Sequence, residues 1–182
     1  MLNNFTSSNI SAAVNLASFF VIAVGLFYTA RQIKLLIKIH QENHDWNRRV
    51  AAQSALVAIR ELTETIQQIE AVFQHGNTNN VIALSIIKEK IESNKKLRPQ
   101  IARYLSSYES LARGILQGIY DEEVVMTGRR GQMTKVFNQF YHYIDLRRKT
   151  INKNYCSCME DVVKRWKSKD VKVKQRSAIG RD

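Results

Sequence analysis

The sequence contains few of the residues that interrupt regular structure, with one proline and seven glycines among 182 residues. This scarcity argues against a collagen-like or disordered chain, and against an all-β fold, which needs many tight turns. Apolar residues make up 45% of the chain, enough to build a core, and charged residues make up 24%, as in an average globular protein. The composition therefore predicts one ordered, mainly helical domain with an appendage.

Charged residues are absent from the first thirty positions, although the whole chain has a net charge of +12. Within this stretch, residues 12–30 are apolar apart from Asn15, Ser18 and Thr29. About 20 apolar residues are enough for a helix to cross a bilayer. A cleaved signal peptide would have a positive segment before the apolar run and small residues at a cleavage site after it, and this sequence has neither. We therefore expect a retained transmembrane helix over residues 12–30.

The basic residues that flank this run predict its orientation. Arg31, Lys34 and Lys38 follow the run, whereas only the α-amino group precedes it. Positive flanks stay in the cytoplasm, so we expect a single-pass inner-membrane protein with its N-terminus outside. The predicted division is a short extracytoplasmic segment (1–11), the transmembrane helix (12–30), a helical cytoplasmic domain (31–168) and a basic tail (169–182).

Beyond residue 30, apolar residues recur at spacings of three and four, which is typical of one face of a helix. Residues 31–75 contain no glycine or proline and are predicted to be helical, either continuous or with a bend in the polar segment 41–45, followed by a loop at 77–80. Its apolar stripe consists of Leu56, Ile59, Leu62, Ile66, Ile69 and Phe73. Further helices are predicted at 80–93, from Pro99 to Ile119 and from Met133 to Ile144. The last predicted helix carries Met159, Val162, Val163 and Trp166.

The segment between the third and fourth of these helices contains turn signals. Asp121 is expected to cap a short helix with two glutamates in its first turn, where negative charge meets the positive helix end. Gly128 and Gly131 are expected to mark a basic turn that contains Arg129 and Arg130. The predicted fold class is all-α, with one N-terminal transmembrane helix followed by a cytoplasmic helical bundle.

Three groups of residues together resemble a known family. They are Trp46-Asn47-Arg48-Arg49, Tyr108-Glu109 and the run from Gly118 to Glu123. This pattern, with the later Phe140, Ile144, Arg147 and Trp166, is similar to the bacterial family called domain of unknown function 4760, over roughly residues 12–168. The resemblance implies one N-terminal transmembrane helix and a small helical cytoplasmic domain. It implies no activity, because the function of that family is not established.

The family-like residues are interpreted as packing and turn chemistry, and they form our candidate structural motif: Trp46, Arg48, Arg49, Glu109, Asp121 and Glu122. Asp121 and Glu122 are the best carboxylate cluster, but adjacent residues at a helix start diverge, whereas acid–base catalysis needs convergence on one substrate. Glu109 is expected to reach Arg48 or Arg49 and to join two helices. A buried pair of this kind contributes specificity more surely than stability.

No set of residues has the spacing of a catalytic or metal site. His40 and His44 share one side of a helix, but a stable metal site needs three or four ligands. Cys156 and Cys158 are too closely spaced for half of a zinc site, and both are expected to be reduced thiols. Phosphate-binding and nucleophile-elbow motifs are missing from the sequence. We therefore predict no catalytic residue, no metal site and no cofactor.

The excess of basic residues is the remaining signal. Candidate residues for interaction or lipid contact are Arg129, Arg130, Lys164, Arg165, Lys167 and Lys169. Such residues are attracted to the anionic cytoplasmic leaflet, and a membrane tether makes that surface the nearest polyanion. The same charges would attract nucleic acid without sequence preference, or would serve solubility alone.

These observations lead to a functional hypothesis and an alternative. The first is that the helical cytoplasmic domain mediates protein interaction or self-association, with a membrane-associated anti-phage or stress effector as a special case. The alternative is a membrane-tethered, non-specific nucleic-acid-binding protein, which would need Tyr141, Tyr143 or Trp166 exposed among the basic residues. The stripe from Leu56 to Phe73 is expected either to pair with a second copy of the chain or to pack within its own domain.

Overall fold

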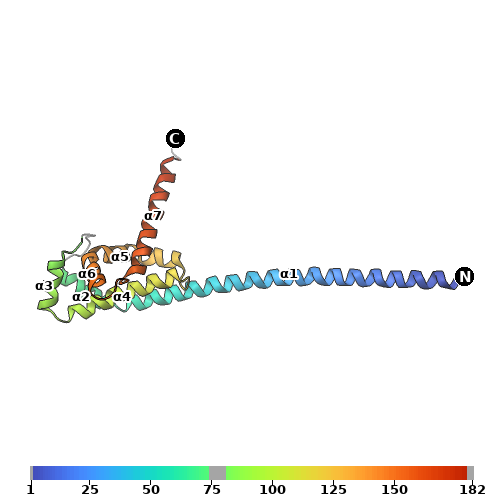
Figure 1. The fold of residues 1–182 in the computed structure, drawn as a ribbon, viewed down its shortest axis with the longest axis horizontal. Helices are drawn as coiled ribbons and strands as arrows, with labels where there is room; N and C mark the ends of the chain where they lie inside the picture. The colour runs from blue at the N-terminus through green and yellow to red at the C-terminus, as the bar shows by residue number, and fades with distance from the viewer. Residues whose placement is uncertain (1, 74–80, 180–182) are drawn as a thin grey trace. The chain divides into compact units, whose positions relative to one another are not determined.

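The computed structural model describes the backbone of residues 2–73 and 81–179, and the side chains of residues 15–73 and 81–169. All regular structure in the described residues is helical, which confirms the predicted all-α fold (Figure 1). The helices are α1 (Leu2–Arg60), α2 (Thr63–Phe73), α3 (Leu84–Ser93), α4 (Leu97–Leu116), α5 (Glu122–Gln139), α6 (Tyr141–Thr150) and α7 (Ser157–Ile179). The loop predicted at 77–80 lies outside the described residues. The chain divides into two units, Met1–Trp46 and Asn47–Asp182.

The first unit contains the N-terminal part of α1. By length and composition, this is one helix near the N-terminus that could cross a membrane, and none of its most apolar window is buried. Phe19 is 70% exposed and Phe27 is 73% exposed. Water would oppose such exposure, whereas hydrocarbon would not, so the side chains suit a helix surrounded by lipid.

In the second unit, the helix predicted over residues 31–75 is divided in two. α1 ends at Arg60 and α2 begins at Thr63, whose hydroxyl donates to the carbonyl of Arg60. The backbone N–H of Leu62 donates to the carbonyl of Ile59 at 3.1 Å, which is the tighter spacing of a turn. No glycine or proline marks this break. The change of direction instead lets the apolar residues on both sides of it reach one core, since Ile59, Ile66, Ile69 and Phe73 are all buried.

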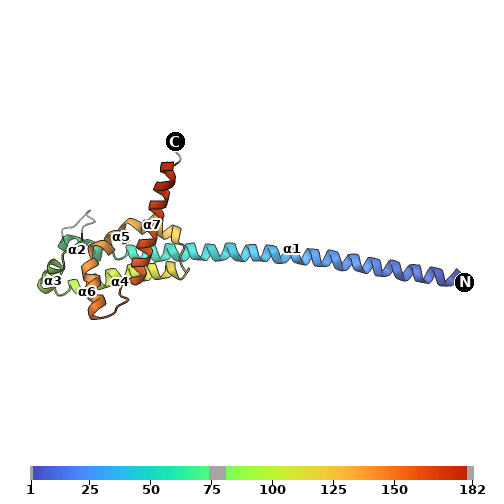
Figure 2. The same cartoon turned by 45° about the horizontal axis from the view of Figure 1, so that its top comes forward.

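α4 is the central helix of this bundle and contacts α2, α3, α5 and α7 (Figures 1 and 2). Pro99 lies in its first turn, as predicted, where its missing N–H leaves no helical hydrogen bond unmade. The residues of its predicted apolar face that are buried are Ile101, Tyr104, Leu105, Tyr108, Leu111, Ala112 and Ile115. The ring of Tyr104 meets that of Tyr108 edge to face, with centroids 5.5 Å apart.

The turn predicted at Gly128 and Gly131 is wrong, because α5 continues through both glycines and through Arg129 and Arg130. Glycine in a helix interior costs about 1 kcal/mol, which buried side chains such as Met133 offset. A Cβ built on Gly128 would lie 3.2 Å from Cδ1 of Leu56, so this glycine allows α5 to approach α1.

The helix predicted from Met133 to Ile144 is also divided, at Phe140 between α5 and α6. Phe140 is buried, and its ring meets that of Phe73 edge to face with centroids 5.7 Å apart. The bend therefore places this side chain in the core. The apolar face predicted for the last helix is confirmed, because Met159, Val162, Val163 and Trp166 are all buried.

Candidate functional site

The end of α1 is tied to the short connection between α4 and α5. The backbone N–H of Asp121 donates to the carbonyl of Arg48 at 3.3 Å, and Nη2 of Arg48 donates to the carbonyl of Tyr120 at 3.4 Å. Next to them, Nε of Arg49 pairs with Oδ2 of Asp121 at 3.4 Å. Two consecutive arginines thus hold two consecutive residues of this connection.

The connection itself is shaped by glycines. Gly118 adopts a φ of 71°, and its N–H donates to the carbonyl of Ile115, while Ile119 N–H donates to the carbonyl of Gly114. This is the Schellman arrangement, which ends α4 and turns the chain. The Tyr120 ring then lies against Gly114, where an added Cβ would be 2.2 Å from two ring carbons. Both glycines are therefore needed to bring Tyr120 and Asp121 to α1.

Asp121 caps α5, as predicted. Its Oδ1 accepts the backbone N–H groups of Glu123 at 2.9 Å and Val124 at 3.2 Å. Burial alone would raise the pKa of Asp121, but these hydrogen bonds and the Arg49 guanidinium outweigh burial and lower it. The carboxylate is therefore ionised and already engaged, which is the capping role inferred from the sequence.

Glu122 joins the start of α5 to α7. Its Oε1 accepts the indole N–H of Trp166 at 3.0 Å and the Lys169 ammonium at 2.7 Å, and its Oε2 accepts from Arg165 at 3.1 Å. Burial raises the pKa of Glu122, but donation by Lys169, Trp166 and Arg165 outweighs it, so the pKa is lowered. Asp121 and Glu122 thus face different helices and do not converge on one point.

The expectation that Glu109 would reach Arg48 or Arg49 is wrong. Its carboxylate is directed to the start of α7, where Oε1 accepts the N–H of Cys158 at 3.1 Å and Oε2 accepts that of Met159 at 2.8 Å. The first N–H groups of a helix have no partner within it, and they carry partial positive charge. A buried carboxylate satisfies both requirements, so Glu109 packs against a helix end, with Nη2 of Arg113 on its own helix 4.0 Å from Oε1 as a more distant partner.

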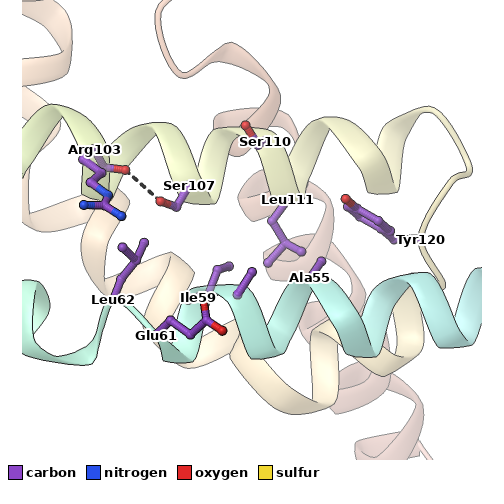
Figure 3. Close-up of a pocket in the computed structure, with 10 residues that line it drawn as sticks. Ala55, Ile59, Glu61, Leu62, Arg103, Ser107, Ser110, Leu111 and Tyr120 are labelled. Carbon is purple, nitrogen blue, oxygen red and sulfur yellow. Dashed lines mark hydrogen bonds between the residues drawn. The ribbon is translucent and has the colours of Figure 1, made fainter.

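A groove of about 410 Å³ lies between the end of α1 and α4 (Figure 3). Figure 3 shows Ile59, Leu62 and Leu111 projecting into the space between the two helices, with Tyr120 at one end. Glu61 and Arg103 lie at its edge. The hydroxyl of Ser107 donates to the Arg103 carbonyl at 2.7 Å, so it is held by its own helix. The groove is thus an apolar surface with an acidic and a basic residue at its edge.

A family model described as Domain of unknown function (DUF4760) matches residues 19–166. The chain belongs to this family. The matched region covers most of α1 and the bundle as far as Trp166, so it includes the contacts of Arg48, Asp121, Glu122 and Glu109. No curated protein and no solved structure matches the chain.

Most residues of the motif proposed from the sequence form contacts between helices of this DUF4760 domain. Arg48, Arg49 and Asp121 hold α1 against the α4–α5 connection, while Glu109 and Glu122 hold α7. Trp46, in the first unit, is 65% exposed. The structure therefore supports packing and turn chemistry for five of the six residues, and it gives Trp46 a surface position.

The six basic candidates lie on α5 and α7, with Lys167 and Lys169 just beyond the matched region, and they contact nearby acceptors. Arg165 and Lys169 bind Glu122, and Lys164 pairs with Glu160 at 2.6 Å. Arg130 Nη2 donates to the Trp166 carbonyl at 3.3 Å, Lys167 to Asn138 at 3.4 Å, and Arg129 to Gln132. Their charge is therefore partly neutralised within the domain. The side chains of the predicted basic tail beyond Lys169 lie outside the described residues.

The aromatic residues considered for base stacking are mostly in the core. Trp166 is fully buried and Tyr143 is 4% exposed, whereas Tyr141 is 46% exposed. A base can stack only on a ring face that is accessible. Among these three residues, only Tyr141 meets that condition.

Sequence reasoning placed Arg148 in a basic region but did not identify its structural role, which is to stabilise the connection between α6 and α7. Its Nε donates to the Tyr155 carbonyl at 2.8 Å, its Nη2 to the Cys156 carbonyl at 3.2 Å, and its Nη1 pairs with Glu160 at 2.7 Å. Cys156 itself has a φ of 56°, which a residue other than glycine rarely adopts. An arginine within a run of basic residues gives no local sign of such a role.

Proposed function

We propose that this chain is a single-pass inner-membrane protein whose helical domain self-associates through the surface formed by the end of α1 and the groove beside it. The observation that carries the proposal is the groove of Figure 3, where exposed Ala58 and partly exposed Ala55 and Leu62 lie above the buried side chains of Ile59 and Leu111. On the same part of α1, Val50 is 42% exposed and Val57 is 52% exposed. Apolar area exposed in this way gains free energy when a partner covers it.

The edge of the groove favours a second copy of the chain as the partner. Glu61 and Arg103 are both exposed, and neither forms an ion pair with another described residue. In a two-fold interface the same patch meets itself, so an acid and a base on one patch can pair with the base and the acid on the other. Ala55 and Ala58 also line the groove, and small side chains allow helices to approach closely. A membrane span would hold two copies parallel and raise their local concentration.

Most of the stripe from Leu56 to Phe73 does not belong to the surface that we propose, although Ile59 and Leu62 line the groove. Ile59, Ile66, Ile69 and Phe73 are buried within the domain, which supports the expectation that the stripe packs internally. Ile59→Asp should therefore unfold the domain, because an unpaired charge would enter its core. Val57→Asp should leave the domain folded, because Val57 is exposed. It should abolish self-association, because it would place a charge on an apolar interface. The two variants lie on the same helix, one at a buried and one at an exposed position. Together they distinguish an effect on folding from an effect on self-association.

Charge reversal at the edge of the groove tests the two-fold geometry. A photo-crosslinking residue at Val57, in two differently tagged full-length copies expressed together, should yield a product with both tags, whereas one at exposed Gln67 should not. Glu61→Arg or Arg103→Glu alone should lower that yield, because like charges would face each other. The double variant should restore it. Lys95→Glu, outside the groove, is the control and should change nothing.

Two results would overturn self-association. One is a double-charge variant that crosslinks no better than either single variant. The other is a Val57 crosslink that contains only proteins other than this chain. The second result would show that the surface binds a different protein.

We also propose the orientation inferred from the flanking charges, with the N-terminus outside and residues 31–182 in the cytoplasm. Arg31, Lys34 and Lys38 are exposed on α1 and lie on one side of the helix by their spacing. In addition to the six basic candidates on α5 and α7, we expect these three residues to contact anionic lipid, at about 1 kcal/mol each. A reporter fused after Asp182 should be active in the cytoplasm. A periplasmic signal would contradict this orientation without affecting the test at Val57.

Non-specific nucleic-acid binding has less support. Trp166 and Tyr143 are buried, and Arg165, Lys169 and Lys164 already bind carboxylates. Salt-dependent binding to single-stranded DNA that Tyr141→Ala weakens would favour this alternative.

A further inference from the structure

A second hollow, of about 480 Å³, lies between α3, α4 and α6 at the end of the bundle formed by these helices. Three cationic side chains from three different helices line it: Lys88, Arg98 and Arg147. One carboxylate, that of Glu92, also lines it. The hollow therefore carries excess positive charge, although its residues are far apart in the sequence.

Arg147 is held in place without an anionic partner among the residues that the structure describes. Its guanidinium carbon lies 5.8 Å from the ring centroid of Tyr143 and 5.8 Å from that of Tyr155, so both rings hold it by cation–π contact. Its Nε is buried and donates to no described protein group. An arginine nitrogen can only donate, so a partner must supply an acceptor.

Tyr143 gives a second, independent indication. It lines the hollow and is 4% exposed, yet its hydroxyl has no hydrogen-bond partner among the described residues. A buried polar group without a partner costs about 1–3 kcal/mol. The Arg147 Nε and the Tyr143 hydroxyl are thus two buried polar groups without a described partner, and they lie beside exposed cations. This arrangement suits the binding of an anion with several oxygen atoms.

The rest of the lining is apolar apart from Thr150, whose hydroxyl donates to the carbonyl of Leu146 at 2.9 Å. Ile91, Leu146 and Ile151 contribute hydrocarbon surface, and Ile151 is 60% exposed. An inorganic anion would leave this surface uncovered, whereas an anion attached to an apolar group would cover it. Pockets of about 300–1,000 Å³ with apolar walls and a few convergent polar groups are typical of small-molecule sites.

We propose that this hollow binds a phosphate group attached to an apolar moiety, with Arg147 and Arg98 as the main phosphate ligands and Ile91, Leu146 and Ile151 covering the apolar part. Arginine suits this chemistry because its donors match phosphate oxygens in pairs. The apolar part is either the ring face of the base in a soluble nucleotide or the chains of an anionic lipid. This site is separate from the self-association surface and does not depend on it.

Calorimetric titration of the full-length protein in an uncharged detergent tests the proposal. The probes are inorganic phosphate, adenosine monophosphate and a short-chain phosphatidylglycerol. At least one of the two organic probes should bind saturably, and at least about tenfold more tightly than inorganic phosphate. Tighter binding of adenosine monophosphate identifies a soluble ligand, and tighter binding of phosphatidylglycerol identifies a lipid.

Variants then show whether the binding belongs to this hollow. Arg147→Gln and Arg98→Gln should each weaken it about tenfold or more, whereas Lys95→Gln, at an exposed position outside the hollow, should leave it within about twofold. If Arg147→Gln fails to fold, Arg98→Gln decides the matter, because Arg98 is exposed. The proposal is overturned if neither organic probe binds saturably, or if Lys95→Gln weakens binding as much as Arg98→Gln.

Discussion

Glu109 and Met159 are 50 residues apart in the chain, yet Oε2 of Glu109 accepts the backbone N–H of Met159 at 2.8 Å. The other oxygen accepts the N–H of Cys158, so a side chain in the middle of α4 caps α7. A cap usually comes from the residue that precedes its helix. Here a helix end and a buried charge satisfy each other across the core, and this contact fixes where α7 begins against α4.

Removing this remote cap should destabilise the domain. Glu109→Ala would leave two backbone N–H groups at a helix start without an acceptor, and we expect a loss of about 2–4 kcal/mol in the free energy of unfolding. Glu109→Gln keeps one acceptor oxygen and should cost less, about 1–2 kcal/mol. Chemical denaturation followed by the fluorescence of buried Trp166 measures both. Equal stability of Glu109→Ala and the unchanged protein would contradict the capping role.

Glu122 should make the domain sensitive to acid. Its pKa is lower in the folded protein than in the unfolded chain, so its stabilising effect is complete above the unfolded pKa of about 4.3. The effect is lost as the pH falls through the lower folded pKa. Glu122→Gln should therefore reduce stability by about 1–2 kcal/mol at pH 7 and much less below about pH 3.

Glu123→Gln is the matched control for this effect, since Glu123 lies in the same helical turn and is exposed. It should cost no more than about 0.5–1 kcal/mol at pH 7. Unfolding midpoints measured across this pH range for both variants provide the comparison. A loss at Glu122 that does not change with pH would show that packing, and not charge, carries its role.

Replacement of three glycines by alanine, one at a time, should change the stability of the domain in different ways. Gly114→Ala would place a Cβ 2.2 Å from ring carbons of Tyr120 and should cost about 1–3 kcal/mol. Gly118→Ala would force a side chain into a φ of 71° and should cost about 1–2 kcal/mol. Gly131→Ala meets nothing within 4 Å inside a helix, so it should stabilise by up to about 1 kcal/mol. The midpoint of thermal unfolding should therefore fall for the first two variants and rise for Gly131→Ala.

The two cysteines should differ in reactivity, although both are free thiols. Burial, and next the negative charge of Glu109, raise the pKa of Cys156 to about 12, so almost none of it is thiolate at neutral pH. Cys158 is partly exposed. Brief treatment with N-ethylmaleimide, followed by peptide mass spectrometry, should find Cys158 labelled and Cys156 unlabelled until denaturant is added. Equal labelling of both in the folded protein would contradict the burial of Cys156.

Features that depend on neighbouring residues could be predicted from the sequence. The candidate span, the start of α4 at Pro99 and the cap at Asp121 each rest on a few adjacent side chains and their own backbone. The buried faces of α4 and α7 follow from the spacing of apolar residues, because a helix places every third or fourth residue on the same side. For the same reason the resemblance to DUF4760 could be recognised before any contact was known.

The tertiary structure alone decided the features that depend on distant partners. The break after Arg60 and the continuity of α5 through Gly128 and Gly131 reflect core packing that outweighs local propensity. The partners of Glu109, Glu122 and Arg148 depend on which helices meet. A carboxylate binds whichever donors the fold brings within about 3 Å, and no spacing along the chain encodes that distance.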